Sequence, residues 1–382
     1  MRLAYLKYGD VVAELQLLRQ TASSEKSGPY QYVNQMLQFM GNHKGLFVSY
    51  NAKNETAHYD QITTCNINVA PNNSSILIKA TSRIICFFKT LLLLFKFKPG
   101  RIVCAAHRQV LWASFIFSKL YKIPLVHSRH GAVFKAKTGK NPFETLDNII
   151  IRQSKAVLCH GPFLKDQLIA IGVPEHKIIM FTAQYQSLAV NTPCQLSSET
   201  MRLISEPFVL FIGRLVKEKG IYDLLDASLQ EKLPRILFAG DGPDFYKLKK
   251  KIEQLHLAEK ALLLGYVPHD QLRGIIKKTL CVVSPTHPSL SEGFNKTVVE
   301  SFIFGKPVIA PQFGVFLYQI THNKNGLLFK PNSSADLAKK IRKIVSDTGL
   351  QKKLSVNAFY TGQSYLYPET SFYQAVSNAL KS

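Results

Sequence analysis

The chain has 382 residues, of which 46% are hydrophobic and 19% charged, and it carries 48 basic against 25 acidic side chains. This composition is typical of a folded globular protein and excludes a disordered chain, while the length predicts two domains that each bury a core. The net charge of +23 attracts polyanions, namely nucleic acid, an anionic membrane face or phosphorylated substrates, and says nothing about the fold.

The N-terminal segment and the cysteines predict a cytoplasmic protein. The first ten residues, MRLAYLKYGD, lack an apolar segment of the length that a signal peptide needs. The cysteines show no CxxC spacing, and several lie in apolar runs where a buried, reduced thiol is usual. They are Cys65, Cys86, Cys104, Cys159, Cys194 and Cys281. A reducing compartment is therefore expected.

Short β-rich runs alternate with helix-length segments in both halves of the chain. In the first half the runs span residues 2–6, 45–50, 101–106, 124–128, 156–161 and 177–181. In the second half they span residues 208–213, 235–240, 261–266, 281–285, 307–310 and 326–329. Because strands separated by helices form βαβ units, each half is predicted to be a doubly wound, Rossmann-like α/β domain.

The most apolar segment, residues 84–101, has two interpretations that the sequence leaves open. Lys89 and Lys96 interrupt it, and it is too short to span a bilayer. It is either a core helix or a helix lying on a membrane surface. The basic residues in and around it favour the second interpretation; they are Lys79, Arg83, Lys89, Lys96, Lys98 and Arg101.

The domain boundaries are predicted from a polar region with two prolines, Pro193 and Pro207. The assigned segments are an N-terminal domain of residues 1–190, a linker of residues 191–206, a C-terminal domain of residues 207–362 and a final helix within residues 363–382. The final helix has apolar spacing at Phe372, Val376 and Leu380. It is expected to pack back on the N-terminal domain.

Three loops that follow strands of the second half carry groups suited to a nucleotide. Arg214 and Lys219 follow the first strand, and Gly240 and Gly242 follow the second. Glycines there let the backbone approach a ligand closely. A later loop carries Glu292. Because ligands bind beyond the carboxyl ends of such strands, these groups predict a site for a nucleoside diphosphate attached to a polyol.

The segment SEGFNKTVVESFIFGKPVIA, residues 291–310, places two carboxylates around a helix start. Asn295 is a good N-cap, so a helix is expected to begin near Lys296, with Glu300 on its second turn and Glu292 in the loop before it. The amides of residues 293–297 would form a helix N-terminus that favours an anion. The two carboxylates can then accept hydrogen bonds from hydroxyls, one from the transferred sugar and one from ribose.

The second half resembles the donor domain of the retaining glycosyltransferases of family 4, which have the GT-B fold. The resemblance covers residues 207–344 and rests on FIGRLVKEKGIYDLLDA, FAGDGPDFYKL, LLGYVPHDQL, SPTHPSLSEGFNKTVVESFIFGKPVIA and NGLLFKPNSSADLAKKI. It implies two Rossmann-like domains with a cleft between them. It implies that Arg214 and Lys219 bind the donor diphosphate, that Glu292 contacts the donor sugar and that Glu300 contacts ribose. Amides after Glu292 would hold sugar and phosphate, which implicates Gly293, Phe294, Lys296 and Thr297.

The first half resembles the same family less, and it is expected to bind the acceptor. The segment from Arg101 to Phe134 is similar to the family's middle strands, and there an active-site histidine of the family matches His130. His107 and His127 are interpreted as structural. The family's glycine-rich loop near the start is absent, with Gly28 as the one candidate, and residues 181–188 replace the family's usual turn before the linker.

The resemblance implies a transfer with retention of configuration, in which the leaving diphosphate assists the incoming hydroxyl because no carboxylate of the motif is an obvious nucleophile. The predicted catalytic residues are Glu292, His130, Arg214 and Lys219. The cations and the helix amides would stabilise charge on the diphosphate. No DxD-type metal site is apparent in the sequence, so neither a metal nor another cofactor is expected.

The expected partners are a nucleotide-sugar donor and a glycan or lipid-linked glycan acceptor, in the synthesis of a cell-surface polysaccharide, a lipopolysaccharide or a glycolipid. A peripheral contact with the anionic inner face of the cytoplasmic membrane is a further expectation, drawn from residues 84–101. Two rival functions stay open. One is a sugar-nucleotide epimerase or hydrolase on the same scaffold. The other, a nucleic-acid-binding protein, is suggested by charge alone, and no specific nucleic acid is expected because no recognition motif is present.

Overall fold

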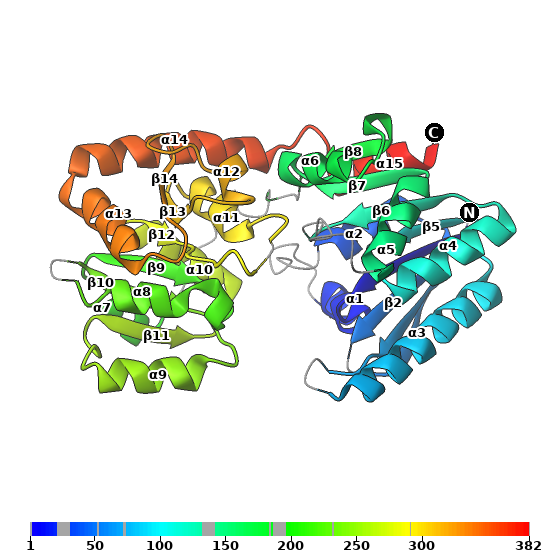
Figure 1. Ribbon diagram of the computed structural model, residues 1–382, viewed down its shortest axis with the longest axis horizontal. Helices are drawn as coiled ribbons and strands as arrows, with labels where there is room; N and C mark the ends of the chain where they lie inside the picture. Colours follow the sequence, from blue (N-terminus) through cyan, green and yellow to red (C-terminus); the bar gives the residue numbers. More distant parts are fainter. Residues whose placement is uncertain are drawn as a thin grey trace. The chain divides into compact units, whose positions relative to one another are not determined.

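The structure is a computed structural model that describes residues 2–20, 31–51, 53–71, 74–131, 142–182, 185, 196–230, 233–290 and 292–381 (Figure 1). The chain forms two compact units, and each has its own sheet, which is parallel in the second unit and parallel except at one edge strand in the first. The first unit contains residues 1–183 and 368–382, and the second contains residues 184–367.

The first unit is built on an eight-stranded sheet in the order β3-β4-β2-β1-β5-β6-β7-β8. Neighbouring strands are parallel, with one exception: β3 is antiparallel to β4. The strands are β1 (Arg2–Tyr8), β2 (Lys44–Asn51), β3 (Glu55–Tyr59), β4 (Ile62–Asn68), β5 (Arg101–Cys104), β6 (Leu125–Arg129), β7 (Ala156–His160) and β8 (Ile178–Phe181). The order places β1 between β2 and β5, as expected for a doubly wound domain.

Helices cover both faces of this sheet because successive strand residues point to opposite sides. Ala4 and Leu6 of β1 pack into one core cluster, and Leu3 and Tyr5 pack into the other. The first cluster is completed by α3 (Ile76–Phe97), α4 (Gln109–Tyr121), α5 (Pro142–Gln153) and α6 (Pro162–Ala170). The second cluster is completed by α1 (Val11–Gln20), α2 (Gln31–Met40) and α15 (Phe372–Lys381). A 3-10 turn, η3 (Glu175–Lys177), precedes β8.

The chain returns to the first unit at its end. Phe372, Val376 and Leu380 of α15 are buried in the same cluster as Tyr5 and Phe181. The Phe372 ring lies 5.1 Å from the Phe181 ring and 6.4 Å from the Tyr5 ring, measured between centroids. Figure 1 shows α15 beside β7 and β8, two strands that are far from this helix in the sequence. Hydrophobic burial therefore fixes this helix on the first sheet.

The second unit is built on six parallel strands in the order β11-β10-β9-β12-β13-β14. They are β9 (Phe208–Ile212), β10 (Arg235–Ala239), β11 (Ala261–Gly265), β12 (Val282–Val283), β13 (Val308–Pro311) and β14 (Gly326–Phe329). In chain order this is the 3-2-1-4-5-6 arrangement of the Rossmann fold. The predicted pair of doubly wound domains is confirmed, and each predicted strand overlaps an observed one.

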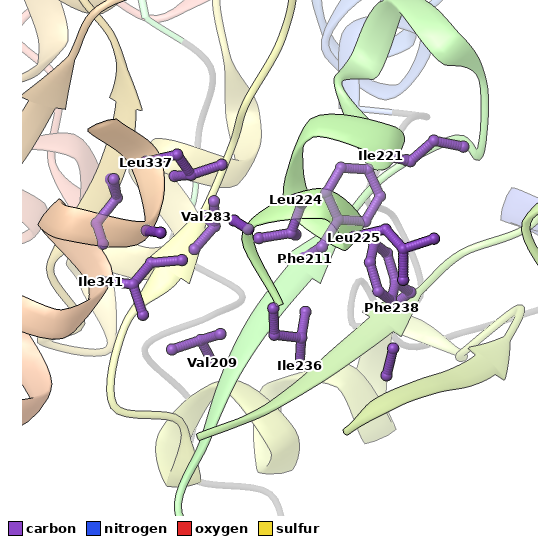
Figure 2. Packing of buried hydrophobic residues seen from close by; sticks show 14 of the residues in the cluster. Val209, Phe211, Ile221, Leu224, Leu225, Ile236, Phe238, Val283, Leu337 and Ile341 are labelled. Carbon is purple, nitrogen blue, oxygen red and sulfur yellow. The ribbon is translucent and has the colours of Figure 1, made fainter. Parts of the chain in front are cut away.

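One core of the second unit lies between the sheet and helices α8, α9 and α13. Figure 2 shows Val209 and Phe211 of β9, Ile236 and Phe238 of β10, Leu224 of α8 and the labelled residues of α13 in one core cluster. The helices and turns of the unit are α7 (Ser198–Leu203), η5 (Lys217–Lys219), α8 (Ile221–Ala227), α9 (Phe245–Gln254), α10 (His269–Lys278), α11 (Lys296–Ile303), α12 (Phe316–Gln319), α13 (Ser334–Ser346) and α14 (Thr348–Leu366).

Two segments differ from their expected form. The hairpin of β3 and β4 was not predicted, because its sequences, ETAHY and ITTCNIN, contain no apolar run. Residues 191–195 of the expected linker lie outside the described residues, and the rest of it carries α7.

The apolar segment is part of a longer helix, α3, that begins at Ile76. One face of it joins the core through Cys86, Thr90 and Leu94, and the opposite face is exposed. Contact of the exposed face with a membrane stays a prediction. No helix among the described residues combines the length and the apolar character needed to cross a membrane.

Candidate functional site

The second sheet reverses its strand order between β9 and β12. β10 lies on one side of β9 and β12 on the other, so the loops that follow β9 and β12 leave the sheet edge in opposite directions. In doubly wound sheets this point is where ligands bind. The loop after β9 carries Arg214 and Lys219, and the loop after β12 carries Glu292, as the sequence predicts.

Lys219 and Glu292 meet at this point. The Lys219 Nζ donates to Glu292 Oε1, and the two side chains are 24% and 13% exposed. Glu292 is held further by Asn295 Nδ2, which donates to Oε2 at 2.6 Å, and by the Thr286 hydroxyl, 3.4 Å from Oε1. The carboxylate therefore has a fixed orientation, with donors from two loops that are far apart in the sequence.

Asn295 both starts α11 and orients Glu292. Its Oδ1 accepts from the Val298 N–H at 3.1 Å, which confirms the predicted N-cap and the helix start at Lys296. Its Nδ2 also donates to the Ser284 hydroxyl at 3.2 Å, and its backbone exchanges two hydrogen bonds with the Gln319 amide. The sequence indicated the cap, whereas the bonds that hold Asn295 to Ser284 and Gln319 join residues 11 and 24 positions away, which no local pattern reveals.

Glu300 lies on the second turn of α11, as predicted, and faces a histidine. His269 is the first residue of α10, in the segment that follows β11, and its Nε2 lies 3.5 Å from Glu300 Oε1. The nearby Glu300 carboxylate raises the pKa of His269, against the opposing effect of burial. The two glutamates thus have different partners, Lys219 for Glu292 and His269 for Glu300. His269 was not predicted, although it lies in the quoted segment LLGYVPHDQL.

The glycines after β10 are required by contact between loops. A Cβ on Gly240 would lie 1.9 Å from the Gly213 carbonyl oxygen, and one on Gly242 would lie 2.5 Å from the Leu215 carbonyl oxygen. The Leu215 N–H donates to the Asp241 carbonyl at 2.9 Å, so the loops after β9 and β10 are joined by their backbones. This packing explains why both positions need glycine. Their contact with a donor stays a prediction.

The remaining predicted residues of this unit surround the start of α11. Gly293 is buried, while Thr297 and Phe294 are half-buried, and the Phe294 ring lies 6.2 Å from the Tyr365 ring between centroids. Lys296 is exposed. The first N–H groups of a helix have no acceptors within the helix, which makes this end a favourable place for an anion.

Arg214 is exposed at the end of β9 and forms no ion pair with any residue that the structure describes. It therefore differs from Lys219, which is already held by a carboxylate. An exposed guanidinium on a loop keeps its rotamer freedom and can reach an anionic ligand without breaking an ion pair.

His130 belongs to the first unit, so its role toward a donor held by the second unit stays a prediction. It follows β6 directly, and its Nε2 lies 3.0 Å from the Ser128 hydroxyl. Its ring lies 4.7 Å from the Tyr32 ring and 5.7 Å from the Phe181 ring between centroids. It is half-buried on an aromatic wall at the carboxyl edge of the sheet.

The other two histidines of this edge are held neutral by their surroundings. His127 is fully buried, and burial lowers its pKa well below the usual value. Burial, with the neighbouring guanidinium of Arg129 as the second cause, lowers the pKa of His107 to about 3. Arg129 Nη1 lies 3.0 Å from His107 Nδ1, and Arg129 is itself buried at the end of β6. The family's glycine-rich loop, with Gly28, falls outside the described residues.

Two family profiles match the chain, one in each unit. Residues 202–360 match the family described as glycosyl transferases group 1. Residues 46–181 match the family described as glycosyltransferase family 4. Together these matches cover well over half of the chain.

Individual relatives agree with these profiles. An uncharacterised glycosyltransferase of Methanocaldococcus jannaschii is 34% identical over 207 residues, 53% of this chain and 53% of the relative. The gpi3 subunit of the phosphatidylinositol N-acetylglucosaminyltransferase of Schizosaccharomyces pombe is 29% identical over 164 residues, 42% of this chain and 34% of the relative. The matches therefore span about half the length of such relatives or less.

Among solved structures, Anabaena HepE in complex with UDP and glucose superposes with a TM-score of 0.71 at 18% identity, covering 100% of this chain and 99% of that one. At this identity the likeness shows the fold alone, and the fold is the GT-B arrangement of two Rossmann-like domains.

Proposed function

The chain belongs to the glycosyltransferases of group 1, and we propose that it transfers a sugar from a nucleoside diphosphate to a hydroxyl group, with retention of configuration. The observation that carries the proposal is the contact between Lys219 and Glu292 at the point where the second sheet reverses its strand order. A cation and a fixed carboxylate at such a point suit a ligand that has both a diphosphate and hydroxyls.

The roles follow from the partners of each side chain. Lys219 and Arg214 bind the diphosphate, together with the N-terminal amides of α11. When Lys219 turns to a phosphate, Glu292 keeps the bond from Asn295 and gains room to accept a hydroxyl of the transferred sugar. Glu300 accepts hydroxyls of the ribose, and His269 beside it restrains the carboxylate.

The reaction breaks the bond between the anomeric carbon and the diphosphate oxygen. The acceptor oxygen forms its bond on the same face of the sugar, and the departing diphosphate takes the acceptor's proton. Negative charge grows on the leaving group, and Lys219, Arg214 and the helix end stabilise it there. This assigns to protein cations the role that a metal ion has in other transferases. His130, from the first unit, assists near the transferred sugar.

The substrates are proposed at the level of class. UDP-hexoses are the first donors to test, because UDP and glucose are named in the HepE structure. The acceptor is a glycan or a lipid-linked glycan of a cell-surface polysaccharide, lipopolysaccharide or glycolipid, and the lipid named in the S. pombe relative supports a lipid-linked acceptor. The proposed location is the cytoplasm, with peripheral attachment to the inner face of the membrane.

A donor screen tests the proposal. UDP-, GDP-, ADP- and dTDP-sugars are compared for their effect on the melting temperature, since a ligand that binds the folded state raises it. The stabilising donor is then incubated with and without acceptor. A glycoside that forms only with acceptor supports the transferase, whereas an epimerised or free sugar formed from donor alone identifies the epimerase or hydrolase instead.

A further inference from the structure

Helix α3 exposes a continuous apolar stripe along its outer face. Leu77, Ile84, Phe88, Leu92 and Phe95 recur at spacings of three, four and seven, which places them on one side of the helix. Four of them are more than half exposed, with Leu77 at 74%, Leu92 at 68%, Phe88 at 63% and Ile84 at 58%. The stripe extends about 27 Å along the helix axis. Exposed apolar surfaces of this extent mark interaction sites.

The stripe continues onto α4. Helices α3 and α4 pack side by side, and Figure 1 shows them as neighbours. The Phe95 ring of α3 lies 5.9 Å from the Tyr121 ring of α4, between centroids. In the same part of α4, Ile116 is 47% exposed and Leu120 is 63% exposed. The exposed residues of the two helices form one surface, the α3–α4 face.

Cations line the margins of this face, and carboxylates are absent from it. The stretch from Gln61 to Phe143 contains no Asp or Glu, and this stretch includes both helices. The exposed basic residues of the two helices and of their C-terminal ends are Arg83, Lys89, Lys96, Lys98, Lys119 and Lys122. The combination of an apolar stripe with cationic margins is the composition of a helix that lies in a membrane interface.

A basic hollow adjoins the face at the end of α4. It has a volume of about 260 Å³ and is lined by Lys119, Lys122 and Lys155, with no carboxylate among its lining residues. Phe115, beneath Lys119, forms part of the same wall, and the Lys119 ammonium lies 5.2 Å from the centre of its ring. A hollow of this charge suits a phosphate group.

We propose that the α3–α4 face docks the first unit on a bilayer leaflet that carries anionic headgroups. The apolar stripe enters the boundary between headgroups and acyl chains, and the lysines contact phosphates around it. Nucleic acid fits poorly, because its charged phosphate backbone would not bury the exposed apolar side chains of Leu92 and Phe88. A second copy of the chain fits poorly as well, because pairing through this face would bring the same cations together.

The docking inference stands on the first unit alone and does not depend on the transfer reaction. Its consequence for the acceptor rests on the proposed function: a transferase docked in this way would meet lipid-linked acceptors at the membrane surface. The two ideas can therefore fail separately, and the experiment is designed to distinguish their failures.

Vesicle co-sedimentation of the full chain tests the docking. Vesicles of phosphatidylcholine are compared with vesicles that also contain phosphatidylglycerol, at low and high salt. Binding is expected to the anionic vesicles and to weaken with salt. Reversal of Lys89, Lys96 and Lys98 to Glu should lower the partition coefficient at least about 100-fold, since each basic residue near such a surface contributes about 1 kcal/mol.

A matched control separates this face from general charge attraction. The exposed Lys249, Lys250 and Lys353 of the second unit are reversed to Glu, which changes the net charge by the same amount. The control variant should bind vesicles far better than the α3–α4 variant. Phe88→Ser with Leu92→Ser, which leaves the charge unchanged, should weaken the binding that remains at high salt.

Three results would overturn the docking proposal. One is that the wild-type protein stays in the supernatant with anionic vesicles at low salt. If this unbound protein is a dimer in analytical ultracentrifugation, the face is assigned to a second copy of the chain instead. The second is equal loss of binding in the two charge-reversal variants. The third is unchanged high-salt binding after both serine substitutions. Each variant is also tested for UDP binding by calorimetry and for sugar transfer in the donor and acceptor incubation. UDP binding without vesicle binding would overturn the docking alone, and vesicle binding without sugar transfer would overturn the proposed function alone.

Discussion

Replacing Lys219 with alanine is the sharpest test of the diphosphate site. The ammonium is held by Glu292 and is 24% exposed, so it is preorganised at the proposed site and partly screened by water. A charge-assisted hydrogen bond to a phosphate is worth about 1.5–3 kcal/mol, which corresponds to a loss of about 10- to 150-fold in kcat/KM. Because of the partial exposure, the expected loss for Lys219→Ala lies toward the lower end of this range.

The assay is steady-state kinetics with the donor that the screen identifies, and the melting temperature of each variant is measured alongside. Lys217→Ala is the matched control, since Lys217 is an exposed lysine in the same turn, η5. Its backbone N–H donates to Asp244 at 2.8 Å, a bond that alanine retains. Wild-type kcat/KM in both Lys219→Ala and Arg214→Ala, with both variants folded, would refute the assignment of the diphosphate to these cations.

Three further predictions concern the other groups of the site. In calorimetry with the nucleoside diphosphate, Glu300→Gln should weaken binding about tenfold, whereas Glu292→Gln should reduce transfer more than binding; equal losses of affinity would show that the two roles are not divided. His130→Ala should lower kcat and leave nucleoside diphosphate binding intact, and unchanged turnover would remove His130 from the site. Gly240→Ala should destabilise the second unit by about 1–3 kcal/mol in urea unfolding, because its Cβ would meet a backbone carbonyl oxygen at 1.9 Å; Gly265→Ala, whose Cβ meets nothing within 4 Å and whose φ of 66° is the left-handed conformation, should destabilise it less.

Local signals in the sequence predicted the frame of the molecule. Each apolar run that was read as a strand overlaps one, because a strand buried on both faces needs a continuous apolar segment. The start of α11 was also predictable from a local signal, because the Asn295 side chain caps the helix by accepting from an N–H only three residues away. The hairpin of β3 and β4 lacks such a signal, since its strand at the sheet edge is mostly exposed.

Only the tertiary structure shows which side chains of the site contact one another. Lys219 and Glu292 are 73 positions apart, and only the reversal of strand order at β9 and β12 brings their loops together. The partners of the two carboxylates differ in sequence distance. Asn295 is three positions from Glu292, whereas His269 is 31 positions from Glu300 and lies on another helix, so packing brings this second pair together. Gly240 and Gly242 suggested a ligand from the sequence, and the structure gives them a contact with the neighbouring loop.

Helix α3 shows how far the sequence alone could go. The sequence indicated an apolar segment at residues 84–101 that basic residues interrupt and flank, a composition attracted to anionic surfaces, and it left a core helix and a surface helix as alternatives. Apolar residues occur all around the helix, so their spacing could not tell which side is buried. Packing on the first sheet decided this, because Cys86, Thr90 and Leu94 face the core and leave Phe88 and Leu92 in contact with solvent.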